Sequence, residues 1–301
     1  MRDPVVRAAE LAPVGARRRR MAPYLFLLPV MVFLIAFYYY PFVKTIVTSF
    51  TVTDAAGQFK KVVGFRNFLM IFKRKDFLPI LGNTLRFVPM IALPTLLLGL
   101  LLALFANKRA PGVSRLTETM FSMPMAIASA SAALVWSLIY NPVVGVANYL
   151  LGLQINWLTD DRFAMLSVAI VTVWLQTGSN FIFLLTALRG VPQDLMESAM
   201  IDGAGGLRKF FHITLPMISP TLFFVIFLDI MGSFQAFGQI RILTQGGPGI
   251  ATHVLVYDIY LEAFMNYRFG TACAESLILF AMMLMVTLIQ FRFENKGVHY
   301  A

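Results

Sequence analysis

A polar, glycine-rich stretch interrupts an otherwise hydrophobic chain. Residues 197–216 read ESAMIDGAGGLRKFFHITLP and lie between two long apolar segments. Gly203 fits the position just past a helix end, where the backbone often needs a positive φ angle. Together with Ala199 and Ala204 it makes a turn almost bare of side chains, which lets another protein surface approach closely. Glu197 lies too late in its helix to gain much from the helix dipole, so a basic partner would suit it.

Other polar side chains fall inside the apolar segments. Such groups are costly in a membrane and mark a pathway for a solute by default. The alternative is that they hold helices together through hydrogen bonds. Aromatic faces and amide or carboxylate groups suit the binding of a sugar, and the candidates are Trp174, Gln176, Asn180, Asp229, Ser233 and Gln235. Glu275, near the outer end of the last apolar segment, is expected to reach the membrane interface.

The sequence indicates neither a metal site nor a nucleotide site. The three histidines, His212, His253 and His299, fall in separate loops or tails, whereas metal ligands must converge on one point. The single cysteine, Cys273, excludes a cysteine-rich metal site. No Gly-x-x-x-x-Gly-Lys-Ser/Thr motif is present. Any energy that drives work by this chain would therefore come from a partner protein or an ion gradient.

The composition places these groups in a membrane protein. Of 301 residues, 58% are hydrophobic and 13% are charged, about half the charged share of a soluble domain. Continuous apolar runs of about 20 residues can cross the hydrocarbon layer as helices. The sequence predicts an all-α polytopic membrane protein with six transmembrane helices, near Tyr24–Phe42, Leu85–Phe105, Phe121–Tyr140, Met165–Leu188, Met217–Phe237 and Ala272–Phe293.

The positive charges predict how the chain is oriented. Arg17–Arg20 directly precede the first apolar segment, as in proteins with a cytoplasmic N-terminus. Residues 1–20 are then an Arg-rich cytoplasmic tail, residues 21–301 form one membrane domain, and residues 189–216 form a cytoplasmic loop. Six spans place both termini in the cytoplasm. The net charge of +10 does not indicate nucleic-acid binding, because the arginines do not alternate with aromatic residues on a soluble face.

The first external loop departs from the positive-inside rule. It carries Lys60, Lys61, Arg66, Lys73, Arg74 and Lys75. These residues either contact an acidic binding protein or form a solvated face. Its segment Gly64–Phe68 mixes turn formers with aromatic residues, which is typical of a short helix lying along the membrane surface. In the next external loop, Trp157 is expected to anchor the chain at the interface.

The opening stretch resembles the cytoplasmic loop of permease subunits of binding-protein-dependent ABC importers. That loop has Glu-Ala-Ala, then Gly-Ala three residues later, then Ile-x-Leu-Pro. The matches here are Glu197, Ala199, Asp202, Gly203, Ala204, Phe210, Ile213, Leu215, Pro216 and Pro220, with Ser198 replacing the first alanine. Gly64–Phe68 and Thr244–Pro248 resemble external motifs of the carbohydrate-uptake branch, whose permeases carry maltose-type sugars or glycerol-3-phosphate.

The resemblance implies a permease of a bacterial or archaeal cytoplasmic membrane. A dimer of cytoplasmic ATP-binding subunits would use ATP and magnesium, while this chain would bind no cofactor and no metal and would not be an enzyme. A second homologous permease subunit and an extracytoplasmic solute-binding protein would complete the transporter. The resemblance assigns coupling to the ATPase to Glu197, Ser198, Ala199, Asp202, Gly203, Ala204, Leu207 and Pro216, and contact with the binding protein to Gly246, Gly247 and Pro248.

Alternatives remain open at this stage. An anionic solute such as glycerol-3-phosphate would need a basic residue in the pathway. Arg86 and Lys44 are the main basic residues of the spans and lie near the outer edge, which favours a neutral sugar over glycerol-3-phosphate or a related polyol phosphate. An ion-coupled secondary transporter using Asp229 is a further alternative, although it leaves the glycine-bearing loop unexplained. A membrane enzyme would need converging His, Asp or Glu residues, and the sequence offers no such set.

Overall fold

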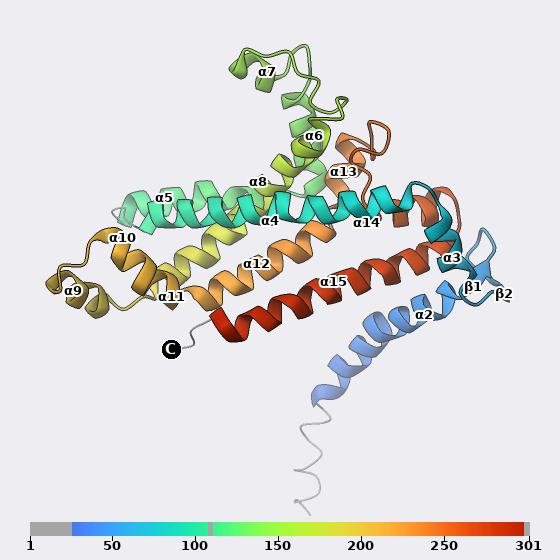
Figure 1. Ribbon diagram of the computed structural model, residues 1–301, viewed down its shortest axis with the longest axis horizontal. Coiled ribbons are helices and arrows are strands. Elements are labelled where there is room, and N and C mark those ends of the chain that lie inside the picture. Colours follow the sequence, from blue (N-terminus) through green and yellow to red (C-terminus); the bar gives the residue numbers. More distant parts are fainter. Residues whose placement is uncertain (1–25, 108–110, 298–301) are drawn as a thin grey trace, which may run out of the picture.

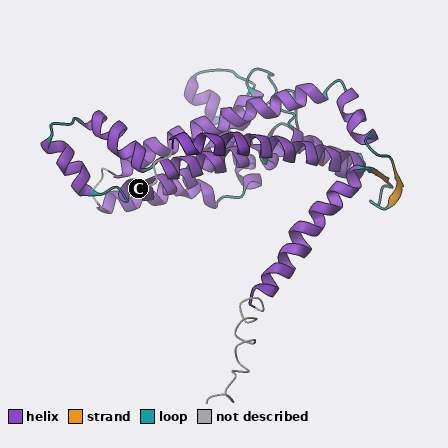
Figure 2. Cartoon of the chain, turned by 60° about the horizontal axis from the view of Figure 1, so that its bottom comes forward, coloured by secondary structure: helices purple, strands orange, loops and turns teal. Residues whose placement is uncertain are grey.

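The computed structural model describes residues 26–107 and 111–297. Long helices lie side by side in an elongated bundle, and the first helix diverges from it (Figures 1 and 2). The Arg-rich tail of residues 1–20 lies outside the described residues. Four helices are long and apolar enough to cross a membrane: Phe26–Ser49, Phe77–Asn107, Ala164–Arg189 and Phe269–Arg292. The predicted number of six is reached if two bent pairs each count as one span: Leu116–Ala126 with Ser129–Ile139, and Gly206–Met217 with Ser219–Phe234.

The membrane-crossing elements and their extensions are predominantly α-helical. Their bounds are α2 (Tyr40–Ser49, preceded by the π-helical turn Ile35–Tyr39), α4 (Phe77–Asn107), α5 (Pro111–Ser122), α6 (Ser129–Ile139), α8 (Ala164–Arg189), α12 (Ser219–Phe234) and α15 (Phe269–Gly297). The connecting elements are β1 (Thr51–Thr53), β2 (Phe59–Val62), α3 (Arg66–Lys73), α7 (Val146–Leu151), α9 (Gln193–Ile201), α10 (Gly206–Lys209), α11 (Leu215–Met217), α13 (Phe237–Leu243) and α14 (Leu255–Tyr260).

The third predicted span is not one straight helix, which corrects the expectation for Phe121–Tyr140. A 3₁₀ turn, Met123–Ala126, follows α5, and the chain is extended at Ile127 and Ala128 before α6 begins. The two helical arms meet at an angle of 101°. Pro124 explains the break, because proline has no N–H for the helix ladder and disfavours a helical residue before it.

Helix α8 is the centre of the bundle, packed against α4, α12 and the end of α5. Its partner helix α4 comes very close at Gly99, where a Cβ atom would lie 2.7 Å from the Cβ of Asn180. A buried cluster that includes Phe181, Leu184 and Val225 fills the space among these helices. The absence of a side chain at Gly99 therefore allows the contact between α4 and α8 that carries the rest of the packing.

The connection between α2 and α4 contains a hairpin that the sequence did not predict. Strands β1 and β2 pair as an antiparallel hairpin, with Thr51 opposite Val62. Helix α3 is attached beside the hairpin, because the amide of Asn67 donates hydrogen bonds to the carbonyls of Ser49 and Thr51 at 2.7 and 2.9 Å. The expected short helix in this loop is thus present and starts at Arg66.

Trp157 is not an interfacial anchor. Its side chain is buried, and its indole N–H donates to Oδ1 of Asn148 at 2.8 Å. The ring also stacks on Tyr140 with a centroid distance of 5.6 Å. The expectation failed because indole is amphipathic and suits a polar contact inside the fold as well as the membrane interface.

Candidate functional site

The glycine-bearing loop forms a helix, a tight turn and a second helix, as predicted. Helix α9 ends at Ile201, and Gly203 follows with a φ angle of +75°. The amide of Gly203 donates to the carbonyl of Met200 at 3.0 Å, and that of Ala204 donates to Ala199 at 2.9 Å. These two bonds form a Schellman motif, which needs a left-handed residue between them. Pro192 caps α9 instead of occupying its first turn, one position earlier than predicted.

The second arm of the loop runs continuously toward α12. Helix α10 is followed by the π-helical turn Phe210–Thr214 and then by α11, where Pro216 lies in the first turn. A cavity of about 920 Å³ separates this arm from the ends of α4 and α8. The loop lies at one end of the bundle, with α9 and α10 projecting beyond the long helices (Figure 1).

Large apolar side chains on this loop face solvent. Ile201 is 88% exposed and Leu207 is 78% exposed, on opposite sides of the glycine turn. Glu197, Ser198 and Asp202 are also exposed. Glu197 makes no ion pair within the described part of the chain. An exposed apolar pair beside bare backbone is suited to contact with another protein.

Three of the candidate pathway residues form a buried polar junction between α8 and α12. The amide of Asn180 donates to Oδ2 of Asp229 at 2.7 Å, and both residues are 2% exposed. The hydroxyl of Ser233 donates to the carbonyl of Asp229 at 2.6 Å. Since these polar atoms are satisfied within the chain, the arrangement is that of a helix–helix contact.

The remaining candidates lie apart from this junction. The amide nitrogen of Gln176 lies 2.8 Å from the place of a Cβ atom on Gly232, so α8 and α12 approach closely there. Its carbonyl oxygen is buried without a hydrogen-bond partner among the described residues. Gln235 is an exposed residue at the C-terminal end of α12. Gln176 is therefore the candidate with an unused polar atom.

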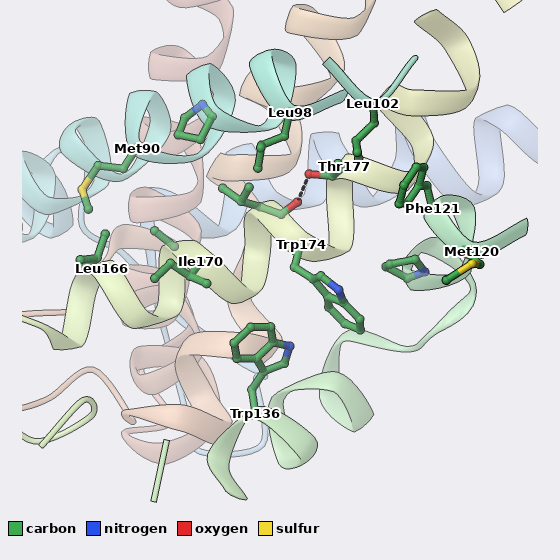
Figure 3. A pocket seen from close by; sticks show the side chains of 14 residues that line it. Met90, Leu98, Leu102, Met120, Phe121, Trp136, Leu166, Ile170, Trp174 and Thr177 are labelled. Atoms are coloured by element: carbon green, nitrogen blue, oxygen red, sulfur yellow. Dashed lines mark hydrogen bonds between the residues drawn. The ribbon is translucent and has the colours of Figure 1, made fainter. Parts of the chain in front are cut away.

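Trp174 faces a different, apolar cavity. The cavity has a volume of about 480 Å³ and lies between α4, α8 and the bent arms α5 and α6. Trp174 and Trp136 meet there edge to face, with ring centroids 5.9 Å apart (Figure 3). Residues 174 and 176 differ by two positions on a helix and point to nearly opposite sides. Trp174 and Gln176, both predicted pathway residues, therefore lie on two different faces of α8.

The loop after α13 is fastened to α4 by hydrogen bonds. The amide of Asn83 near the N-terminal end of α4 donates to the carbonyls of Ile250 and His253 at 2.7 and 3.2 Å. Gly246 has a φ angle of +82° and is buried, since a Cβ atom there would lie 2.9 Å from the ring of Tyr257. Gly247 and Pro248 are half-buried, and the exposed residues of the turn are Gln245, Gly249 and Ile250.

An ionic cluster near this loop was not predicted. The guanidinium of Arg74, after α3, pairs with Asp258 on α14 and lies 3.3 Å from Oε1 of Glu275 on α15 and 3.5 Å from Oε1 of Glu262. Asp76 binds the same guanidinium at 2.8 Å. Glu275 is fully buried, which overturns its expected position at the interface. The four-residue spacing of Asp258 and Glu262 was the available signal, because such residues share one face of a helix.

Electrostatics in the cluster favours the ionised forms of its external members. Burial alone would raise the pKa of Asp258, but hydrogen bonds from His253 and Arg74 outweigh it and lower that pKa below the ordinary value. Burial likewise works against the charge of Arg74, yet Asp258 and the neighbouring carboxylates raise its pKa overall. The imidazole of His253 lies 3.1 Å from Asp258. The cluster thus links the segment after α3 to α14 and α15.

Known proteins identify the family to which this architecture corresponds. The family model described as the inner membrane component of binding-protein-dependent transport systems matches residues 95–296. The chain belongs to this family. It is therefore a multi-pass inner-membrane permease of an ABC importer that works with a solute-binding protein, as the loop motif predicted.

Individual relatives match over nearly the whole chain. The sn-glycerol-3-phosphate transport system permease protein UgpA of Agrobacterium fabrum is 36% identical over 287 residues, covering 93% of this chain and 97% of that protein. The protein of the same name from Yersinia enterocolitica is 35% identical, covering 92% and 95%. A crystal structure of a bacterial ABC transporter involved in the import of the acidic polysaccharide alginate contains a similar fold, with a TM-score of 0.82 and 23% identity over 93% of this chain and 96% of that chain.

Proposed function

We propose that this permease imports sn-glycerol-3-phosphate or a closely related polyol phosphate. The observation that carries the proposal is the 36% identity with a glycerol-3-phosphate permease over 93% of this chain. A phosphate prefers charge-assisted hydrogen bonds from cationic groups. Residues 164–188 of α8 and all of α12 carry amide and carboxylate side chains but no lysine or arginine. Recognition of the phosphate would therefore fall mainly to the solute-binding protein and to a second permease subunit.

The glycine-bearing loop is proposed to dock into a cytoplasmic ATPase subunit. Ile201 and Leu207 would enter apolar contacts there, and the turn at Gly203 would let the partner backbone approach. Ser198, Ala199 and Ala204 are small enough for such an approach, while Glu197 and Asp202 would meet polar or basic groups. The second arm leads through Pro216 into α12 without a flexible linker, which supports transmission of ATPase closure to the spans.

The ATP and magnesium belong to that partner in this proposal, and the permease itself carries out no catalysis. The loop would lie in the cytoplasm together with both chain termini. The exposed external turn at Gln245, Gly249 and Ile250, beside Gly247 and Pro248, would receive the solute-binding protein. A second permease subunit is proposed as a further partner. The exposure of the first helix supports this proposal, because none of its residues from Phe26 to Tyr39 is buried within this chain.

The test is uptake by the reconstituted transporter in liposomes. The permease, its partner permease, the ATPase and the loaded binding protein should take up labelled sn-glycerol-3-phosphate only when ATP is present. Uptake driven by an ion gradient without the ATPase would contradict the coupling proposal. Competition by organic phosphate esters, but not by maltose, would support the proposed solute class.

A neutral sugar is the second candidate, favoured by the absence of lysine and arginine from α12 and from residues 164–188 of α8. The same liposomes distinguish the two candidates. ATP-driven uptake of a maltose-type sugar, with none of glycerol-3-phosphate, would replace the solute assignment while leaving the coupling proposal intact.

A further inference from the structure

Helix α3 presents two kinds of side chain to its surroundings. Phe65, Leu69 and Phe72 recur at intervals of four and three residues and form an apolar stripe on the helix surface. They are 69%, 59% and 56% exposed. Arg66 and Lys73, seven residues apart, lie beside this stripe and are exposed as well. The helix therefore has an apolar face with a basic edge.

The opposite face fixes the helix to the bundle. Ile71 is buried and packs in a cluster with Phe77, Ile80 and Leu255. Asn67, one turn earlier, is held by the carbonyls of Ser49 and Thr51. Because this face is anchored at two points, the apolar stripe cannot turn inward, and its exposure is a property of the fold.

The stripe lies between two membrane-crossing helices. Phe65 contacts Phe50 after α2 with a centroid distance of 5.2 Å, and Phe72 meets Phe77 at the start of α4 at 5.3 Å. Leu78, the next residue of α4, is exposed. Figure 1 shows α3 at the end of the bundle where these helices begin and end. The apolar face is thus continuous with surfaces that face lipid.

The exposed charges on α3 and on the two flanking segments, residues 59–65 and 74–75, are positive. Residues 59–75 contain lysines and arginines but no aspartate or glutamate. Arg74 is used internally by its carboxylate partners. Arg66, Lys73 and Lys75 make no ion pair within the described chain and remain available. An apolar stripe bordered by basic residues is typical of a helix in the membrane interface, where cations meet anionic headgroups.

We propose that α3 is an interfacial anchor that binds anionic phospholipid, with Phe65, Leu69 and Phe72 among the acyl chains and Arg66, Lys73 and Lys75 at the headgroup phosphates. This assignment also accounts for Arg66, Lys73 and Lys75, three of the basic residues that break the positive-inside rule in this loop. The leaflet is the outer one if the proposed orientation holds. The lipid contact itself requires neither that orientation nor the proposed solute.

The experiment uses the complete transporter in nanodiscs of equal phosphatidylglycerol and phosphatidylcholine. A tryptophan is introduced by Leu69→Trp, and its quenching by brominated phosphatidylglycerol is compared with its quenching by brominated phosphatidylcholine. The transporter without this substitution supplies the background from Trp136, Trp157 and Trp174. We expect stronger quenching by the anionic lipid, and a preference that falls by about five-fold for each basic residue removed.

The test variant carries Arg66→Gln, Lys73→Gln and Lys75→Gln. The matched control, Arg162→Gln, removes an exposed basic residue of the loop before α8 and should keep the preference, whereas the single substitution Lys73→Gln should lower it about five-fold. The proposal would be overturned if both lipids quench the tryptophan introduced by Leu69→Trp equally while all basic residues are intact. An equal loss of preference in the test and control variants would also overturn it. So would a lack of quenching by either lipid, or shielding of the new tryptophan by the binding protein, because the face would then belong to a protein partner.

Discussion

The two ends of this permease differ in how their side chains are partnered. At the end that bears Arg74, charged groups pair with one another and Asn83 fastens the neighbouring loop. At the other end, the loop around Gly203 leaves Ile201 and Leu207 in solvent. The contacts of Arg74 and Asn83 are made within one chain, whereas the loop at Gly203 exposes apolar area that another protein can cover. The difference indicates that substitutions in the first region should act on stability and those in the second on coupled transport.

The largest effect is expected at the centre of the ionic cluster. Arg74→Gln would leave the buried carboxylates of Asp258, Glu262 and Glu275 without their cation, a loss of about 3 kcal/mol in the free energy of unfolding. The measurement is thermal unfolding of the purified transporter. Lys73→Gln, one residue away on the exposed side, is the control. A melting temperature shared by both variants would show that the cluster does not stabilise this end.

The junction in the middle of the bundle tests whether its polar groups are structural. Asn180→Ala would leave the carboxylate of Asp229 buried without its donor, at a cost of about 2 kcal/mol. Ser179→Ala is the control, since that hydroxyl bonds only the carbonyl of Gln176 in its own helix. If Asn180→Ala instead abolishes uptake with an unchanged melting temperature, the pair acts on the solute and not on packing.

A backbone substitution separates conformation from surface at the loop. Gly203→Val places a β-branched residue at a φ angle of +75°, where such residues are strained. Gly205 has an ordinary φ of −66°, and neither glycine has an atom within 4 Å of an added Cβ. We expect ATP-driven uptake to fall about ten-fold in Gly203→Val, about 1.4 kcal/mol in coupling, with normal amounts in the membrane. A smaller loss of uptake is expected in Gly205→Val. Equal losses in the two variants would assign the effect to the added side chain on a bare surface and not to the backbone conformation of Gly203.

The smallest effect concerns pH. Hydrogen bonds from His253 and Arg74 lower the pKa of Asp258 below its ordinary value of about 3.9. Its carboxylate therefore contributes its full stability at pH values above about 3.9. The contribution is lost as the pH falls through the lowered pKa. Asp258→Asn should therefore be less stable than the unsubstituted protein by about 1 kcal/mol at pH 7. The difference should begin to shrink below about pH 3.9 and vanish only below the lowered pKa of Asp258, and a constant difference at all pH values would contradict this account.

Much of the molecule was predictable because its signals are local. The spans follow from uninterrupted apolar runs, and the turn at Gly203 follows from a glycine placed after a helical stretch. The break in the third span also had a local cause in Pro124, but a proline inside a membrane helix can equally be accommodated without a break. The position of Trp157 and the burial of Glu275 depend on residues far away in the chain, so local patterns could not reveal them.

The sequence by itself determined the class of the protein, its helical spans and the motif of the glycine-bearing loop, because hydropathy, glycine placement and residue spacing act over a few turns of chain. Only the tertiary structure decided which polar groups meet. It joined Asn180 to Asp229, separated Trp174 from Gln176 and gathered three carboxylates from distant parts of the chain around Arg74, beside the neighbouring Asp76. The physical reason is that a buried charge is tolerated only beside a partner, and that partner is set by how distant helices pack.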